Sequence, residues 1–452
     1  MPDNVPDLQE QAAGIFQQMV DEARALGVTE IEAVVAGETQ ALTRFANNAI
    51  HQNVSERVVS VSVRPVIDGR TARATTNRVD RDAIRDVVGQ AIAITRLTEA
   101  DGELPPLAGR AEYPGVTRWY EGTANAAPAE RANAVADAIR VVEGAGQTAA
   151  GIYSTGESVF SLFNSRGIAA HHAETIARFS ITAMASDSSG WAKSSACDHR
   201  GLDVLGLART AARKATGSLA PRELPAGKYT VILEPAAVLD LVGQMFADFS
   251  ATAIRDERSF LNDRLGKKLF GENITIYDDA THSGQSGPPF DGEGVPRKRL
   301  TLVDRGVVKD IAYCRQAAAL AGVEATGHGY PLPNEFGEAP MNIVIAGGES
   351  SVEDMVASIG RGVLVTRLWY IREVDPYEKI FTGMTRDGTF LVEDGQVTAG
   401  LRNFRFNESL IEMLSNVEAL SLPVRASGEE TFDMVAPAMK VRDFHFTEVT
   451  KF

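Results

Sequence analysis

The sequence predicts an α+β fold, in which two helix–antiparallel meander units form an N-terminal region and a β-rich domain with a few helices follows. Two observations indicate this fold class. The hydrophobic period changes from helical to strand-like and back in the same order twice within the first half of the chain. The second half is dominated by short β-rich runs separated by glycine turns. The predicted domains are residues 1–222, with subunits at about 30–98 and 124–220, and residues 227–452.

The first unit begins with apolar residues at helical spacing, which predict a helix over Leu8–Leu26 with Gly27 as its stop. A second helix is predicted at Arg81–Ile94, and a Pro/Gly-rich crossing segment follows at Asp101–Thr123. Between the two helices lie four short β-rich runs, with Asp68-Gly69 as the turn before the last. These runs are Ile31–Val35, Thr39–Phe45, Val58–Val63 and Thr71–Thr76.

The second unit repeats this order of elements. Helices are predicted at Pro128–Val142 and Leu202–Ala215, and the strands between them lie near Ala149–Phe163, Ile168–Ala185 and Ser189–Asp198. The segment Phe45–Ile50 also resembles Phe163–Ile168, at an offset of 163 − 45 = 118 residues. We therefore predict an internal repeat, with chance similarity of two meanders as the alternative.

The C-terminal domain is predicted to begin after the proline-containing boundary Pro221–Gly227. A strand at Lys228–Leu233 is followed by an amphipathic helix at Ala236–Phe249. Later helices are predicted at Ser351–Ile359 and Glu408–Ala419. The predicted later strands are Asn342–Ala346, Gly362–Glu373, Thr389–Glu393 and Gln396–Phe406, with a hairpin turn at Asp394-Gly395.

Composition and charge exclude several classes of protein. The 452 residues are 44% hydrophobic and 23% charged, which is typical of a globular protein. The 45 Lys and Arg against 60 Asp and Glu give a net charge of −15, which argues against nucleic-acid binding. No apolar stretch approaches the ~18 residues of a membrane span, and Met1–Glu10 lacks a signal-type apolar region. We expect a cytoplasmic protein with no membrane partner.

The common motifs of metal, phosphate and nucleophile chemistry are missing. Cys197 and Cys314 cannot by themselves form a disulfide framework or a thiolate zinc site. The sequence contains no H-E-x-x-H, no C-x-x-C and no phosphate-binding glycine motif. Ser286 lies in Ser283–Gly287, but the spacing is wrong for a nucleophile elbow, so a loop is the better interpretation.

Two small clusters contain residue types that can bind metals. In His171-His172-Ala173-Glu174, adjacent side chains on a strand point to opposite faces, so the two histidines cannot converge on one ion. The run from Cys197 to His199 meets the same objection. We therefore favour structural roles for both clusters over metal binding.

Aromatic and charged residues also concentrate in Val365–Tyr377. On a regular strand, one face would carry Arg367, Trp369 and Ile371, and the other would carry Leu368, Tyr370 and Arg372. The simpler interpretation is a strand whose faces are core and covered surface, since aromatic residues are ordinary strand formers. The functional alternative is a peptide-binding edge, where main-chain bonds hold an extended segment and aromatic side chains fill pockets.

Several stretches together resemble the TldD/PmbA family, also called the modulator of DNA gyrase family, over essentially the whole chain. In the N-terminal half these are Phe45–Ile50 and Val66–Arg70, and further on Phe290–Pro296 is similar to the family's acidic-glycine-proline loop. The C-terminal stretches Gly362–Thr366, Phe381–Gly383 and Gly388–Gly395 match best. Their order and spacing make the resemblance specific.

The resemblance implies a heterodimeric zinc metalloprotease that degrades unfolded peptides and trims leader peptides of modified microcins. Its TldD-type subunit carries H-E-x-x-x-H on the helix that opens the C-terminal domain, where two histidines and a glutamate supply ligands and a general base. At the matching positions this sequence has Leu239, Asp240 and Gln244. Leucine cannot bind zinc, and a glutamine amide is a poor substitute for imidazole.

The resemblance is therefore to the TldE (PmbA) type, the partner subunit without metal. The cysteine expected near the C-terminus of the catalytic subunit is also missing, since Cys314 is the last cysteine. We expect no catalytic residue, metal or cofactor in this chain, and zinc in a TldD-type partner subunit. Unfolded or leader peptides are the expected ligands, and a homodimer is expected when the chain is alone.

Two other functions stay open at this point. The chain could be an independent hydrolase or tailoring enzyme that uses Asp291, Glu293 and its histidines, such as His282, for acid–base chemistry. It could also be a homodimeric peptide-binding module without an enzymatic partner. The residues predicted to line a peptide cleft are Asp291, Glu293, Arg367, Trp369 and Tyr370.

Overall fold

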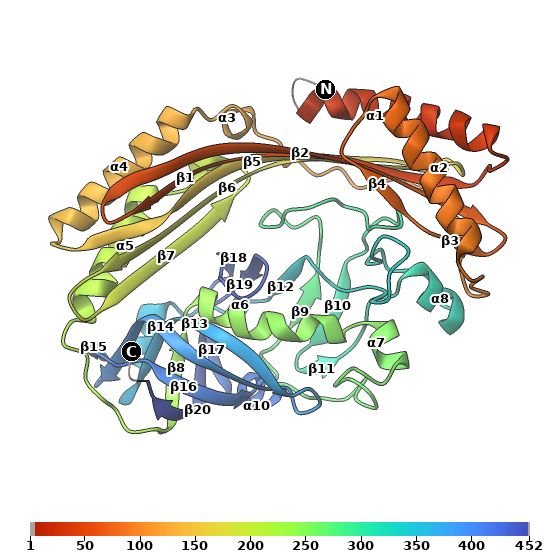
Figure 1. The fold of residues 1–452 in the computed structure, drawn as a ribbon. Coiled ribbons are helices and arrows are strands. Elements are labelled where there is room, and N and C mark those ends of the chain that lie inside the picture. The colour runs from red at the N-terminus through yellow and green to blue at the C-terminus, as the bar shows by residue number, and fades with distance from the viewer. Residues whose placement is uncertain (1–4, 451–452) are drawn as a thin grey trace.

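The computed structural model of the chain describes residues 5–450 (Figure 1). Residues 1–4 and 451–452, where the two predicted domains begin and end, lie outside the described residues. The helices of the N-terminal half are α1 (Val5–Ala25), α2 (Arg81–Leu97), α3 (Glu121–Ala124), α4 (Pro128–Gly144) and α5 (Val204–Gly217). Its strands are β1 (Ile31–Ala46), β2 (Ala49–Ile67), β3 (Arg70–Thr71), β4 (Ala74–Thr76), β5 (Thr148–Asn164), β6 (Ala169–Met184) and β7 (Ser189–Ala196).

The two predicted helix–meander units share a single antiparallel sheet with the strand order β3-β2-β1-β5-β6-β7, in which β4 also pairs with β2. The units join where β1 pairs with β5, from Glu32 opposite Asn164 to Phe45 opposite Gly151. The two similar segments, Phe45–Ile50 and Phe163–Ile168, span the β1–β2 and β5–β6 connections. The predicted α+β class and the repeated order of elements are thus confirmed.

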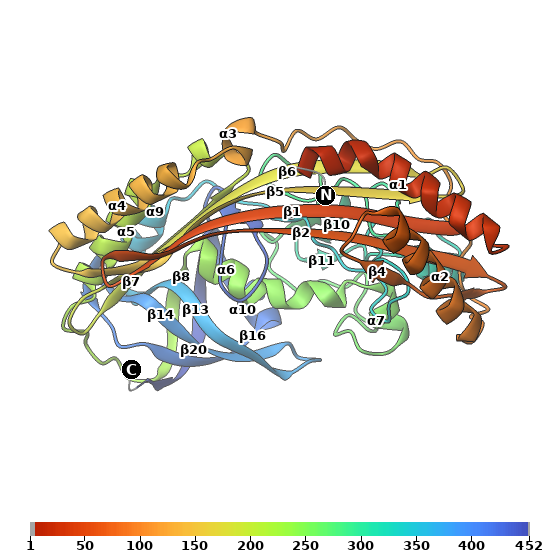
Figure 2. The same ribbon diagram turned by 45° about the horizontal axis from the view of Figure 1, so that its top comes forward.

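One face of this sheet is covered by helices. On β1, Ile31, Ala33 and Val35 pack against α1 and α2, and the outward residues of β5 and β6 pack against α4 and α5. Successive strand residues point to opposite faces, so Val34 and Ala36 lie on the other face. Figures 1 and 2 show that this other face is concave and arches over the C-terminal domain.

The C-terminal domain contains short helices and thirteen strands among the described residues. The helices are α6 (Pro235–Val242), α7 (Ala251–Arg255), α8 (Arg315–Ala321), α9 (Val352–Ala357) and α10 (Leu410–Ser415). The strands are β8 (Gly227–Leu233), β9 (Ile276–Asp278), β10 (Leu300–Asp304), β11 (Val307–Val308), β12 (Ile343–Ile345), β13 (Arg361–Asp375), β14 (Ile380–Glu393), β15 (Gln396–Gly400), β16 (Phe404–Ser409), β17 (Val417–Leu420), β18 (Val424–Ala426), β19 (Met434–Ala436) and β20 (Met439–Val449). Of the helices in residues 5–450, none has the length and apolarity that crossing a membrane requires.

These strands form two sheets around a shared core. One sheet has the order β11-β10-β9-β12-β19-β18. The other runs β13-β8-β20-β16-β14-β15, and because β13 also pairs with β14, five of its strands close into a ring. Helix α6 belongs to the core, with every residue from Ala237 to Val242 buried. The β-rich character predicted for this domain is confirmed.

Several predicted element boundaries were wrong. The runs Ile31–Val35 and Thr39–Phe45 form one continuous strand, because β1 is paired on both sides along its length. The helix predicted over Ala236–Phe249 is α-helical only to Val242 and continues as a 3₁₀ helix over Gly243–Asp248. A Cβ at position 243 would lie 2.6 Å from Thr431 Oγ1, so the close approach of another segment requires glycine there.

The later predictions missed strand lengths as well. Thr389–Glu393 is only the end of β14, and Gln396–Phe406 is divided between β15 and β16. The helix predicted over Glu408–Ala419 is confined to α10, since β16 reaches Ser409 and β17 begins at Val417. Short apolar runs near these ends fit a strand and a short helix equally well, and the sheet pairing decides between them.

Candidate functional site

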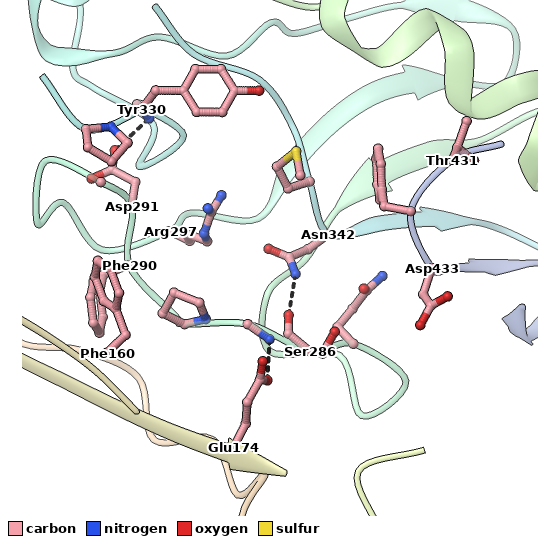
Figure 3. A pocket seen from close by; sticks show the side chains of 18 of the residues that line it. Phe160, Glu174, Ser286, Phe290, Asp291, Arg297, Tyr330, Asn342, Thr431 and Asp433 are labelled. Atoms are coloured by element: carbon pink, nitrogen blue, oxygen red, sulfur yellow. Dashed lines mark hydrogen bonds between the residues drawn. The ribbon is translucent and has the colours of Figure 1, made fainter. Parts of the chain in front are cut away.

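A cavity of about 560 Å³ lies between the concave face of the N-terminal sheet and the C-terminal domain (Figure 3). Its volume is within the usual range of small-ligand sites. The sheet contributes Phe160 from β5, Glu174 and Arg178 from β6, and Lys193 from β7. The C-terminal domain contributes residues from the segments 285–292, 329–331, 341–342 and 428–433, together with Arg297.

The segment 285–290 forms one wall of the cavity and is tied to both domains. Glu174 Oε2 accepts a hydrogen bond from the Gly287 N–H at 2.6 Å, and Asn342 Nδ2 donates to the Ser286 carbonyl at 2.9 Å. Gln285 Nε2 donates to the Ile343 carbonyl at 2.7 Å. The segment is a loop, as predicted, and does not form a strand-to-helix turn around Ser286.

The acidic loop that follows uses its carboxylates to hold its own shape. Asp291 Oδ1 accepts from the N–H groups of Glu293 and Val295, both at 2.9 Å, and Oδ2 accepts from Gly329 at 2.7 Å. Glu293 Oε2 accepts from the Arg315 N–H at 2.8 Å, at the start of α8. Asp291 lines the cavity, whereas Glu293 lies buried beside it.

Burial changes the proton affinity of this pair. It raises the pKa of both carboxyl groups, and the neighbouring Asp291 charge adds to the effect on Glu293, whose pKa reaches about 8. Glu293 is therefore protonated at neutral pH. His282, the other residue considered for acid–base chemistry, lines a separate cavity with Cys197, so the structure does not bring this set together.

A second buried pair lies close to the cavity and had no signal in the sequence. His328 Nε2 is 3.1 Å from Asp278 Oδ1, and both side chains are completely buried. Asp278 Oδ2 accepts from the N–H groups of Met341 and Asn342 at 2.8 and 2.7 Å. This carboxylate therefore positions the segment that carries Asn342, which lines the cavity.

The three α6-region residues that the resemblance places at zinc-motif positions have structural contacts. Leu239 is completely buried in the apolar core. Asp240 Oδ1 accepts from the N–H groups of Glu429 and Glu430 at 3.0 and 2.9 Å, and burial raises its pKa to about 6. Gln244 Nε2 donates to the Asp240 carbonyl at 3.1 Å.

These three side chains do not fit a zinc ion, because leucine has no donor atom and a glutamine amide is a poor substitute for imidazole. Asp240 would be a single ligand, completely buried and with Oδ1 already bonded to the backbone. Within residues 5–450, no group of three or more His, Cys, Asp or Glu side chains has an arrangement that could hold a metal ion.

The aromatic cluster of β13 lies away from the lining of this cavity. Arg367 pairs with Asp387, and both side chains are buried. The Arg367 guanidinium lies 5.0 Å from the ring centre of Trp191 and 5.4 Å from that of Trp369, which fits cation–π contacts. This cluster joins β13 to β7 of the N-terminal sheet.

The regular alternation predicted along β13 was wrong at Ile371. The register against β14 shifts between Trp369 and Arg372, and Tyr370 has a positive φ of 57°. This bulge places both Leu368 and Ile371 in the core, although the sequence assigned them to opposite faces. Tyr370 is half exposed, and its N–H donates to Glu430 Oε1 at 2.8 Å.

The histidines of the two sequence clusters lie in different surroundings. His171 is exposed and His172 is buried on the opposite face of β6, where Nε2 lies 3.4 Å from Glu174 Oε2. His199 Nδ1 lies 3.3 Å from Thr123 Oγ1.

The sequence analysis did not predict most of the cavity lining, including Arg297, Tyr330 and Asn342, and it named Glu174 only in a possible metal cluster. Arg297 directly follows Pro296 of the acidic loop, which was a usable signal. The others come from separate segments and share no local pattern.

Family models match most of this chain in three parts. Residues 32–95 match domain 1 of the PmbA/TldA metallopeptidases, residues 123–219 match the central domain, and residues 226–448 match the C-terminal domain. The three matched ranges fall on the first meander unit, the second meander unit and the β-rich domain described above.

Solved structures and a curated relative agree with these matches. TldE from Thermococcus kodakarensis superposes with a TM-score of 0.86 at 21% identity, covering 96% of this chain and 100% of that chain. A Thermotoga maritima protein described as a modulator of a DNA gyrase gives 0.84 at 20% identity, covering 96% and 100%. Both likenesses show the fold. A metalloprotease from Methanothermobacter thermautotrophicus is 26% identical over 60% of this chain, and the match spans only 61% of that relative.

Proposed function

We propose that this chain, which belongs to the PmbA/TldD metallopeptidase family, is the TldE-type subunit of a two-subunit zinc peptidase. In this proposal the chain holds no zinc and carries out no proteolysis alone. A TldD-type partner supplies the H-E-x-x-x-H helix and the metal, and the present chain helps to hold an extended peptide substrate.

The observation that carries this proposal is the environment of α6. The side chain at the first histidine position is Leu239, enclosed in the core of the C-terminal domain. The glutamate position is filled by Asp240, whose Oδ1 holds the backbone of residues 429 and 430. A general base needs a carboxylate open to the substrate, and Asp240 is completely buried.

The cavity supports the peptide-holding part of the proposal. Its walls combine apolar side chains, such as Phe160, Phe290 and Tyr330, with a few charged groups. Peptides suit such walls because they carry apolar side chains as well as polar main-chain groups. The cavity also lies between the two domains, where a segment of chain can be held from both sides.

Reconstitution tests the proposal. The full chain is purified alone, a TldD-type protein carrying H-E-x-x-x-H is purified alone, and the two are also co-expressed. Cleavage of an unfolded peptide is measured for all three samples, and zinc is measured by elemental analysis. We expect cleavage only in the co-expressed sample, and zinc in proportion to the partner. Stoichiometric zinc in this chain alone, or peptide turnover by it alone, contradicts the proposal.

A matched control uses the partner with its motif glutamate changed to glutamine. The complex should still form in size-exclusion chromatography but should not cleave the peptide. Failure of the two chains to co-purify would also contradict the heterodimeric part of the proposal.

A further inference from the structure

We propose that Arg297 is an anchor for a peptide carboxylate in the cavity between the two domains. The carboxylate, which is a single planar anion, would bind to the guanidinium of Arg297, which lines the cavity (Figure 3). The choice of a peptide as the carrier of this carboxylate rests on the proposed function. The anion site itself rests only on the structure.

The other cations that line the cavity are already paired. Arg178 Nε lies 3.8 Å from Asp433 Oδ2. Lys193 Nζ lies 3.2 Å from Glu429 Oε1 and donates to the Gly428 carbonyl at 2.5 Å.

Arg297 differs from them. Its Nε and Nη1 are enclosed, and neither has a hydrogen-bond partner among the described residues. Enclosed N–H groups without acceptors are costly, and a bound anion that accepts from them removes that cost.

Asp278 and Asp291, which both feel the positive charge of Arg297, bond to other groups. Arg297 lowers the proton affinity of both Asp278 and Asp291, so its positive charge is felt at each. Asp291, however, accepts three backbone N–H bonds, and Asp278 accepts two and contacts His328. Neither forms an ion pair with Arg297 within 4 Å among the described residues. Both instead fix the segments that surround the guanidinium.

The surroundings favour a carboxylate on an organic molecule over a free phosphate. Phe160, Phe290 and Tyr330 give apolar and aromatic walls, which suit the carbon groups attached to a carboxylate. Glu174, Asp291 and Asp433 also line the cavity, and their negative charges disfavour a dianion more than a monoanion.

Arginine presents a planar fork of N–H groups that matches a carboxylate. Because Nε and Nη1 are enclosed, binding would require a different rotamer of the Arg297 side chain, one that presents their N–H groups to the carboxylate.

Direct binding to the full chain tests this anchor without any need for a partner or for cleavage. Three fluorescent hexapeptides of the same apolar sequence serve as probes in anisotropy titrations. The first has a free C-terminal carboxylate and no acidic side chain, the second is its C-terminal amide, and the third is an amide with one internal glutamate. We expect a carboxylate-bearing peptide to bind about ten-fold more tightly than the neutral amide. The tighter of the two carboxylate peptides identifies the source of the anion.

The variant Arg297→Gln should abolish this preference, so that all three peptides bind equally. Arg297→Lys should keep part of it, since lysine retains the charge without the fork. The control is Arg299→Gln, which removes the same charge from an exposed position two residues away and should leave the preference unchanged.

Circular dichroism and the Tm establish that each variant folds. If Arg297→Gln does not fold, Arg297→Lys and the wild-type comparison of the three peptides still decide the question.

Equal affinity of the wild-type chain for all three peptides overturns the proposal, and so does a preference that survives Arg297→Gln. Competition by inorganic phosphate at concentrations matching the peptide affinity overturns the choice of a carboxylate. These outcomes are distinct from failure of the reconstituted cleavage, because an anion site can exist in a chain that has no peptidase partner.

Discussion

The Asp240 side chain accepts a hydrogen bond from the backbone N–H of Glu430 at 2.9 Å, and the Glu430 side chain accepts one from the backbone of Tyr370 at 2.8 Å. Through these two bonds, α6 holds the loop at 428–430, and that loop covers the bulge of β13. Asp240, which the resemblance places at the motif's glutamate position, thus organises the backbone in this chain.

Replacing Asp240 with alanine should destabilise the protein by about 2–4 kcal/mol, because two backbone N–H groups lose their acceptor in a buried place. Chemical denaturation measures the loss. Asp304→Ala is a control, since the side chain of this residue at the end of β10 forms no ion pair or hydrogen bond with the other described residues. Its unfolding free energy should stay within about 0.5 kcal/mol of the wild type. A loss no larger than that of the control would contradict the anchoring role of Asp240.

The stability should also depend on pH through Asp240. Burial raises its pKa to about 6, so the folded chain binds this proton more tightly than the unfolded chain does. The contribution to the unfolding free energy is therefore full below about pH 4 and is lost as pH rises to about 6, by up to about 3 kcal/mol. Asp240→Asn does not titrate and should lack this part. Urea unfolding at pH 4.5 and at pH 7 gives the unfolding free energy of the wild type and of Asp240→Asn. Between pH 4.5 and pH 7, the wild type should lose stability relative to the variant. If the difference in unfolding free energy between the two proteins is the same at both pH values, or if the wild type gains stability relative to the variant, the predicted role of Asp240 is contradicted.

Rebuilding the zinc motif should fail. In the triple variant Leu239→His, Asp240→Glu, Gln244→His, an imidazole would replace a leucine that is completely buried in the core. Loss of that leucine side chain alone costs about 2–5 kcal/mol. We expect a lower Tm and no stoichiometric zinc by elemental analysis. The single variant Gln244→His, at a half-buried position, should fold normally. Zinc at one ion per chain in a folded triple variant would show that α6 can still become a metal site.

A buried ion cluster should control the contact between the domains. Glu32 is paired with Arg64 and Arg73 at 2.9 and 2.7 Å, and Arg73 also donates to the Leu332 carbonyl of the C-terminal domain at 2.9 Å. Burial alone would raise the pKa of Glu32, but the two guanidinium groups together lower it below its ordinary value. Glu32→Gln should therefore cost about 3–5 kcal/mol at neutral pH, since two buried cations lose their partner.

The measurement for this cluster is urea unfolding combined with hydrogen exchange at residues 329–332, which should become faster. The control is Glu30→Gln, which removes a surface partner of Arg166 and should change stability by less than about 1 kcal/mol. The folded-state pKa of Glu32 is lowered, so Glu32 contributes to the unfolding free energy at neutral pH, and this contribution is lost as the solution is acidified. Equal effects of Glu32→Gln and Glu30→Gln would contradict the role of the cluster.

The buried Arg367–Asp387 pair should contribute more to the stability of the fold than the surface ion pairs of β13. Arg367→Ala leaves a buried carboxylate and should cost about 3–5 kcal/mol, whereas Arg367→Lys should lose less. Arg361→Ala, at an exposed position on β13, is the control and should cost less than about 1 kcal/mol. Thermal unfolding followed by tryptophan fluorescence is suitable because Trp191 and Trp369 flank the guanidinium. A loss in Arg367→Ala no larger than that in Arg361→Ala would refute the prediction.

Local sequence patterns predicted the order of most helices and strands but not their lengths. The helices α1, α2, α4 and α5 each have an apolar stripe and clear ends, and the sequence located them within a few residues. The two strand segments predicted before and after Gly37 were one strand, because hydrogen bonds on both sides hold β1 together where its apolar alternation weakens. Bulges, such as that at Tyr370, leave no periodic signal and were missed.

The sequence by itself determined the α+β class, the repeated order of helices and strands, and the chemistry at positions 239, 240 and 244, because periodicity and residue type are local properties. Only the tertiary structure decided that the two meanders share one sheet and that five C-terminal strands close into a ring. It also decided that Arg297 lines a cavity with its Nε and Nη1 unpaired among residues 5–450. These features depend on pairings between segments far apart in the chain, such as Glu174 with Gly287 and Asp291 with Gly329. Such pairings are set by the packing of whole layers, which no short stretch of sequence encodes.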